Sequence, residues 1–147
     1  MIDNLKKLAI GSDHAGYKLK EEIISFLIKE EFEVKDFGTY SEESVDYPDF
    51  AHPVAESIGN GLYNKGILIC GSGIGVCITA NKHANIRAAL CWNTEVAAIS
   101  RLHNDANIVC LPARFIDSTL AIDIVKIFLS TEFEGGRHER RIKKIPF

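Results

Sequence analysis

The chain has 147 residues, of which 46% are hydrophobic and 25% charged, and this balance is typical of one globular domain. A net charge of −3 and a pI of about 5.9 exclude the overall basic field of many nucleic-acid-binding proteins. No apolar run reaches the ~18 residues of a membrane span, and none of signal-peptide length precedes the first predicted strand. We therefore expect a single domain without nucleic-acid or membrane partners.

Each of the four cysteines lies in an apolar or strand-like segment, and none belongs to a C-x-x-C pair. A chain of this length does not need a disulfide framework, so we expect reduced thiols and a cytoplasmic location. Cys77, Cys91 and Cys110 fall inside predicted helices or strands and are interpreted as core residues. Cys70 differs from them because it ends a strand.

The first half of the chain alternates between strand and helix patterns. Leu19, Ile23 and Leu27 share one face of a predicted helix, and Pro48 suits the first turn of another. In chain order we expect a strand over 7–12, a loop over 13–16, a helix over about 17–31, a strand over 32–37, a polar loop and a helix that begins at Pro48.

The second half continues the alternation. A helix is expected to begin at Asn93 or Thr94 and another at Asp117 or Ser118, because these side chains cap helix N-termini. In chain order we expect a strand over 65–70, a helix over 74–83, a strand over 86–92, a helix to about 102, a strand over 107–111, a helix to about 129 and a short basic helix over 137–144.

This order predicts a three-layer, doubly wound (Rossmann-like) α/β fold, with a mostly parallel five-stranded sheet and helices on both faces. Ligands of such folds bind beyond the carboxyl ends of the strands. Asp13 and His14, Cys70 to Ser72, and Arg114 each follow a predicted strand. We therefore expect them at the same edge of the sheet.

Cys70 lies between an apolar strand and the glycine-rich turn 71–75. The turn is neither a dinucleotide fingerprint nor a P-loop, because Val76 replaces the third glycine and the P-loop lysine is missing. Two interpretations of the turn stay open: a tight connection, or an anion cradle of backbone N–H groups. Cys70 is correspondingly either a buried structural thiol or one activated by the following helix N-terminus.

Histidines and arginines supply the remaining candidates. No His-x-x-x-His pair occurs, so no metal centre is expected. The triplet 103–105 is either a turn or the site of a histidine that works near neutral pH. Arg137 and Arg141 would share a helical face, which is either solvated or binds phosphate. That terminal segment could also reach a second subunit.

Together these residues closely resemble the type B ribose-5-phosphate isomerase family, which also includes galactose-6-phosphate isomerase subunits. The matching motifs occur in order and span nearly the whole chain. They are Gly11-Ser12-Asp13-His14-Ala15-Gly16, Asp46-Tyr47-Pro48, Cys70-Gly71-Ser72-Gly73-Ile74-Gly75, Ala80-Asn81-Lys82, His103-Asn104-Asp105 and Glu134-Gly135-Gly136-Arg137-His138.

The resemblance implies an aldose–ketose isomerase of the non-oxidative pentose phosphate pathway, working through a cis-enediolate without metal or cofactor. Cys70 would be the base, because Val76 occupies the position where some members carry a carboxylate base. Ser72 would shuttle protons and His103 would assist ring opening. The remaining substrate contacts implied by the resemblance are Asp13, His14, Tyr47, Gly71, Gly73, Ile74, Gly75, Asn104, Arg114, Arg137 and Arg141.

The family also implies a homodimer or tetramer with its sites at the subunit interface. We expect residues 1–147 to form one isomerase domain whose C-terminal segment, about 131–147, reaches a neighbouring subunit. Two alternatives remain: the same chemistry on a six-carbon sugar phosphate, and a non-catalytic nucleotide- or phosphate-binding module. The presence of both Cys70 and His103 in one chain favours the pentose enzyme over either.

Overall fold

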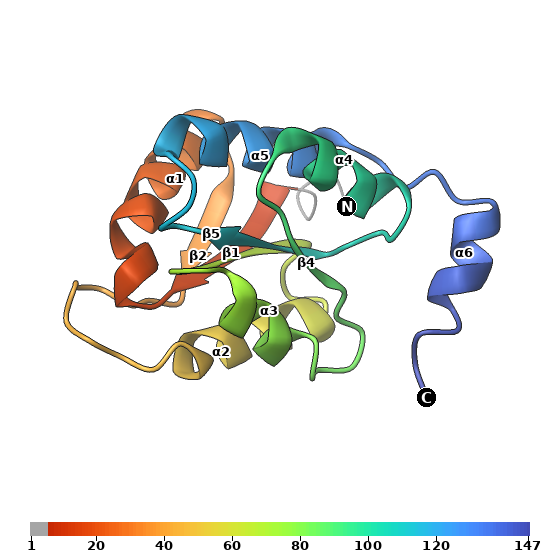
Figure 1. The fold of residues 1–147 in the computed structure, drawn as a ribbon, viewed down its shortest axis with the longest axis horizontal. Coiled ribbons are helices and arrows are strands. Elements are labelled where there is room, and N and C mark those ends of the chain that lie inside the picture. Colours follow the sequence, from red (N-terminus) through yellow and green to blue (C-terminus); the bar gives the residue numbers. More distant parts are fainter. Residues whose placement is uncertain (1–5) are drawn as a thin grey trace.

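The computed structural model describes residues 6–147, in which five parallel strands form one sheet in the order β2-β1-β3-β5-β4. Helices cover both faces of this sheet (Figure 1), as the sequence predicts. The strands are β1 (Lys7–Ser12), β2 (Glu33–Asp36), β3 (Lys65–Cys70), β4 (Ala88–Leu90) and β5 (Ile108–Pro112). The helices are α1 (Tyr17–Lys29), α2 (Pro48–Gly59), α3 (Ile74–Ala80), α4 (Thr94–Leu102), α5 (Ser118–Ser130) and α6 (Arg137–Ile142), with a 3₁₀ turn, His14–Gly16, before α1.

The two layers of the core follow from the alternation of side chains along each strand. On β3, Ile67 and Ile69 face the cluster packed by α1, α4 and α5, whereas Leu68 and Cys70 face the cluster packed by α2 and α3. All four are buried, which explains why β3 reads as a continuous apolar run. Cys70 therefore belongs to the α2–α3 side of the sheet.

The order of the strands creates a switch point at the centre of the sheet. From β1 the chain passes to β2 on one side through α1, and then returns to β3 on the other side through α2. The two connecting helices lie on opposite faces (Figure 1). The carboxyl ends of β1 and β3 thus flank the position at which doubly wound folds bind ligands.

Some predicted elements are longer than the observed ones, each for a local reason. Helix α1 ends at Lys29, and Glu31 beyond it has a φ of +65°, which no helix can accommodate. The edge strand β4 has three residues where seven were expected. The amide side chain of Asn81 accepts a hydrogen bond from the Ala88 N–H at 2.8 Å, and Asn107 accepts one from the Arg87 N–H at 2.8 Å. Asparagine side chains therefore bind the backbone at the start of β4, next to its pairing with β5.

Helix α6 lies beyond the amino ends of the strands, apart from both helical layers (Figure 1). Gly135 and Gly136, with φ values of +73° and +58°, precede it and redirect the chain after α5. Most of its side chains are exposed, with His138 the buried one. The helix is therefore fastened to the body of this chain mainly through its first turn.

Candidate functional site

A cavity of about 410 Å³ opens at the carboxyl edge of the sheet, beside the switch point. The segments that follow β1, β3 and β5 all contribute to it, which is where the sequence predicted that they would meet. The lining residues are Asp13, His14, Ala15, Tyr47, Cys70, Gly71, Ser72, Gly75, Arg114 and Phe115.

Cys70 is the last residue of β3, and its side chain is only 4% exposed. Its Sγ accepts a hydrogen bond from the backbone N–H of Gly73, with an N···S distance of 3.1 Å. An N–H directed at sulfur stabilises negative charge that develops there. The carbonyl of Cys70 is held by the Ala113 N–H at 2.9 Å, so the residue is fixed from both sides.

The turn after Cys70 depends on glycine at two positions. Gly73 has a φ of +73°, and a Cβ there would lie 2.6 Å from Cδ1 of Leu90. At Gly75, a Cβ would lie 2.6 Å from the ring of Tyr47, so the tyrosine packs directly on the backbone. The Ser72 hydroxyl accepts a hydrogen bond from the Ile74 N–H at 3.2 Å. Side chains of the turn itself thus engage the N–H groups of Gly73 and Ile74. Of the turn residues that the sequence predicted as substrate contacts, Gly71, Ser72 and Gly75 line the cavity, whereas Gly73 and Ile74 do not.

Two side chains after β1 form another wall of the cavity. Asp13 caps the 3₁₀ turn, because its Oδ1 accepts a hydrogen bond from the Gly16 N–H at 3.2 Å. Nδ1 of His14 accepts one from the Val45 N–H at 3.2 Å. In its neutral form the imidazole must then carry its proton on Nε2. His14 therefore retains one ring nitrogen for a ligand.

Arg114 follows β5 and covers the turn from the other side. A Cβ at Gly71 would lie 3.0 Å from its Nη1, so the guanidinium packs over the backbone of Gly71. The Arg114 N–H also donates to the Gly71 carbonyl at 3.0 Å. Phe115 is 76% exposed beside it, and sequence reasoning missed this residue. The signal was available, since Phe115 follows a strand end as Arg114 does.

The other three cysteines belong to the core rather than to the cavity. Burial raises the pKa of Cys91 to about 11 and that of Cys110 well above its usual value. A hydrogen bond from Cys110 lowers the pKa of the half-buried Cys77, against the opposing effect of burial. None of the three lines the cavity.

His103 and Asn104 do not lie at this cavity. Helix α4 starts beyond the carboxyl end of β4 and runs back, so His103 at its end lies near the amino ends of the strands, just before β5. Arg137 and Arg141 are exposed on α6. One chain therefore brings together Asp13, His14, Cys70, Ser72 and Arg114, and leaves His103, Asn104 and the two α6 arginines at another edge.

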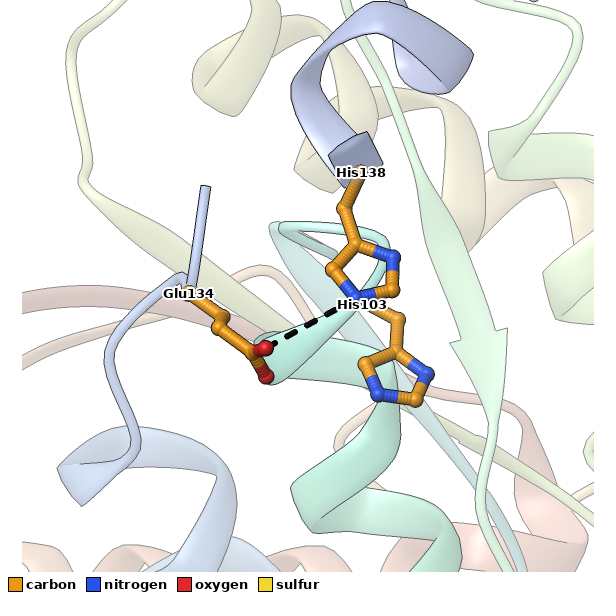
Figure 2. A group of neighbouring side chains, drawn as sticks. All are labelled: His103, Glu134 and His138. Carbon is orange, nitrogen blue, oxygen red and sulfur yellow. Dashed lines mark ion pairs between the residues drawn. The ribbon is translucent and has the colours of Figure 1, made fainter. Parts of the chain in front are cut away.

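His103 instead joins a cluster with Glu134 and His138 (Figure 2). Among residues 6–147, this is the group whose ligand atoms lie close enough to hold a metal, all within 4.8 Å. The imidazole rings are stacked, however, with planes only 12° apart. A metal ion must lie near the plane of each imidazole that binds it, and two stacked parallel planes share no such point. The observed arrangement therefore does not suit a metal ion.

A parallel sheet with a ligand cavity at its carboxyl edge is the architecture of the doubly wound α/β enzymes. More particularly, the chain belongs to the ribose/galactose isomerase family, whose model matches residues 8–145. No helix in the described part, residues 6–147, has both the length and the apolar character needed to cross a membrane.

Individual relatives resemble the chain over nearly its whole length. Ribose-5-phosphate isomerase B of Escherichia coli K12 is 45% identical over 96% of this chain and 95% of its own. The structure of ribose-5-phosphate isomerase B from Clostridium thermocellum has a TM-score of 0.94 and 55% identity, covering 95% of this chain and 94% of that one. That from Mycoplasma genitalium, with bound ribulose-5-phosphate, has a TM-score of 0.91 and 46% identity, covering 95% and 93%.

Proposed function

We propose that this chain interconverts ribose 5-phosphate and ribulose 5-phosphate, with the Cys70 thiolate as the base. The observation that carries this proposal is the placement of Cys70, which lines the sheet-edge cavity and whose Sγ accepts the Gly73 N–H. A relative 46% identical to this chain was solved with ribulose-5-phosphate bound. The cavity volume also falls within the ~300–1,000 Å³ typical of small-molecule sites.

The proton movements balance without a redox partner. The thiolate of Cys70 removes the C2 proton of the open-chain aldose, and the electron pair forms the C1=C2 bond of a cis-enediolate. Backbone N–H groups of the turn 71–75 stabilise the charge on the enediolate oxygen. Ser72 moves a hydroxyl proton from O2 to O1, and the Cys70 thiol returns its proton to C1. The product is the ketose, and the sulfur is again a thiolate.

Substrate contacts within one chain account for part of this site. Arg114 supplies positive charge at the cavity for a phosphate, and the Nε2 of His14 is available to donate to a sugar or phosphate oxygen. Asp13 and Tyr47 line the same space. His103, Asn104, Arg137 and Arg141 lie elsewhere in the chain, so they can contribute only from a second copy.

We therefore propose a homodimer in which the segment 131–147 of one chain completes the cavity of the other. Helix α6 already lies apart from its own sheet (Figure 1). The chain also exposes large apolar side chains on α3 and after β4 and β5, which a partner would cover. They are Ile74 and Ile78 on α3, Trp92 after β4, and Phe115 after β5. The four free thiols support a reducing, cytoplasmic setting for this enzyme.

The direct test is an isomerase assay of the purified protein with ribose 5-phosphate, without added metal or cofactor. We expect ribulose 5-phosphate to form, and Cys70→Ala to abolish its formation while leaving the fold unchanged. Galactose 6-phosphate is the comparison substrate, because the matching family covers both sugars. Faster turnover of galactose 6-phosphate would identify the six-carbon sugar phosphate as the substrate. Binding of sugar phosphates without turnover of either would indicate a non-catalytic module.

A further inference from the structure

His52 and His83 bring two imidazoles together away from the sheet-edge cavity. His52 lies on α2 and His83 follows α3, and neither side chain lines that cavity. Nδ1 of His52 lies 2.6 Å from Nε2 of His83, although 31 residues separate the two histidines in the chain. The proposed isomerase mechanism does not use this pair, and its wide separation in sequence matches no short metal-binding motif.

The two rings are oriented so that their nitrogens converge. Their centroids are 4.9 Å apart and their planes differ by 58°, in contrast to the 12° between the stacked rings of His103 and His138. The lone pair of an imidazole nitrogen lies in the plane of its ring, and two inclined planes share a line on which one ion can lie. The pair therefore has the mutual orientation that the stacked rings lack.

Only a small movement would convert this hydrogen bond into two bonds to a metal ion. Bonds of roughly 2.0–2.1 Å in a tetrahedral Zn²⁺ site place two ligand nitrogens about 3.3 Å apart, so the observed separation must widen by about 0.7 Å. His52 is exposed and His83 is half-buried. Among residues 6–147 neither ring makes another hydrogen bond, so this rotation breaks only the one between them. The shared proton moves to the outer nitrogen of the donor ring.

A carboxylate stands beside the pair. Glu56 follows His52 by four residues on α2, so the two side chains share one face of the helix. Glu56 and His83 both line a cavity of about 230 Å³, formed by the end of α2 and the segment after α3. The exposed carboxylate and water can fill the remaining positions around an ion that the two imidazoles hold. Two imidazole nitrogens and a carboxylate oxygen are a ligand set that suits zinc.

We propose that His52 and His83, together with Glu56, bind one divalent first-row transition-metal ion such as Zn²⁺, which joins α2 to the segment after α3. The ion is structural and not catalytic, because the pair lies outside the sheet-edge cavity. It stabilises the folded chain by mass action. The layer that it fastens packs on the same face of the sheet as Cys70. This inference does not depend on the proposed function.

Titration of the reduced protein with Zn²⁺, in competition with a chromophoric chelator, measures the affinity. We expect the native protein to bind one ion at this site. His52→Asn and His83→Asn should each bind it at least ~10-fold more weakly, because even the loss of a ligand's hydrogen-bonding partner costs that much. His103→Asn is the matched control, since it removes an imidazole from the other histidine cluster, and its affinity should equal the native one. Zn²⁺ should also raise the thermal unfolding midpoint of the native protein and the control, but not those of the two variants.

Co²⁺ is the second probe, because thiolate ligands give it an intense charge-transfer band that imidazole and carboxylate ligands do not. We expect the visible bands of bound Co²⁺ without that charge-transfer band. A thiolate band would place the ion on a cysteine and overturn the proposal. Native affinity in His52→Asn or His83→Asn would overturn it as well, and so would the absence of saturable Zn²⁺ binding by the native protein.

Discussion

At the scale of single residues, the site depends on where one thiol ends a strand. Cys70 and Cys110 are both buried cysteines of neighbouring strands, yet only Cys70 reaches the cavity and accepts a hydrogen bond from the Gly73 N–H. Cys110 lies opposite Leu68, two residues deeper in the sheet. A displacement of two residues along a strand thus separates a position that lines the cavity from one in the core.

The proposed base is tested by Cys70→Ala. Loss of the thiolate should reduce turnover by at least ~10²-fold, the usual contribution of a general base, and the thermal unfolding midpoint should change little. Cys110→Ala is the matched control, because it removes another buried thiol and should affect stability more than turnover. Near-normal turnover of folded Cys70→Ala would refute the assignment. Thiol reagents should also inactivate the native protein, and sugar phosphate should protect it.

Ring opening is tested by His103→Ala. Without this imidazole, conversion of cyclic ribose 5-phosphate should fall by ~10²-fold or more. Enolisation of open-chain ribulose 5-phosphate, followed as proton exchange at C1, should persist. A parallel loss of both activities would instead point to a structural role of His103 at the end of α4.

Cys91 provides a test of burial through pH. Its pKa is raised from the ordinary 9.0 to about 11, so the folded protein keeps the thiol protonated where the unfolded chain has lost the proton. Its contribution to the free energy of unfolding is therefore complete below pH 9 and declines as the pH rises toward 11. As the pH rises from 9 to 11, the free energy of unfolding should therefore fall by about 2 kcal/mol less for Cys91→Ala than for the native protein. Parallel pH profiles from denaturant titrations would contradict this.

At the scale of elements, a buried ion pair ties α1 to β2. The side chain of Lys20 is fully buried, and its Nζ lies 2.7 Å from Oδ2 of Asp36 and 3.0 Å from Oε1 of Glu21. The rings of Tyr17 and Tyr40 lie 5.4 and 5.7 Å from the same ammonium. An ammonium without water contact depends on these partners for its solvation.

Asp36→Asn should therefore destabilise the protein by about 3 kcal/mol, because it leaves the Lys20 charge incompletely paired. Glu21→Gln is the control and should cost under ~1 kcal/mol, since Glu21 is half exposed. The double variant Lys20→Met with Asp36→Asn should recover most of the loss. Urea titration of the four proteins measures these differences, and equal costs for the two single variants would disprove the explanation.

The elements also show how far the sequence predicts the fold. The bounds of β1 and β3 were predicted correctly, because each is a buried apolar run that begins at a lysine and ends at a turn. The prediction for β4 was two residues too long at each end, and the asparagines that bind the backbone at its start, Asn81 and Asn107, come from distant positions. Periodicity detects burial, whereas a strand end that is set by side chains from other segments leaves no local signal.

At the scale of the whole molecule, the sequence predicts which residues of one chain meet at the cavity. It does not predict which residues a second chain would add. Residues that follow parallel strands must lie at one edge, which placed Asp13, Cys70 and Arg114 together. His103 follows a helix, and such a residue lies at the opposite edge because the helix runs back across the sheet. Under the proposed function His103 enters the cavity of a second chain, and no pattern in one sequence encodes that assembly directly.

Subunit mixing tests the shared site. Cys70→Ala and Arg137→Ala proteins should each have little activity, since every site in each homodimer lacks one part. A heterodimer of the two should contain one intact site and one doubly defective site. Activity should therefore return on mixing under conditions that exchange subunits. Absence of recovery, with heterodimers demonstrated by mass spectrometry, would place Arg137 in its own subunit's site or outside it.

The central position of β3 has a consequence for local opening of the structure. Its amide groups are paired on both sides, with β1 and β5, so they should exchange with solvent only when the whole sheet unfolds. The amides of α6, a six-residue helix on a glycine hinge, should exchange by local fraying. The proposed site would thus join a segment of one chain that opens only with the whole sheet to a segment of another that opens locally. Substrate could enter and leave through opening of α6 while Cys70 stays in place.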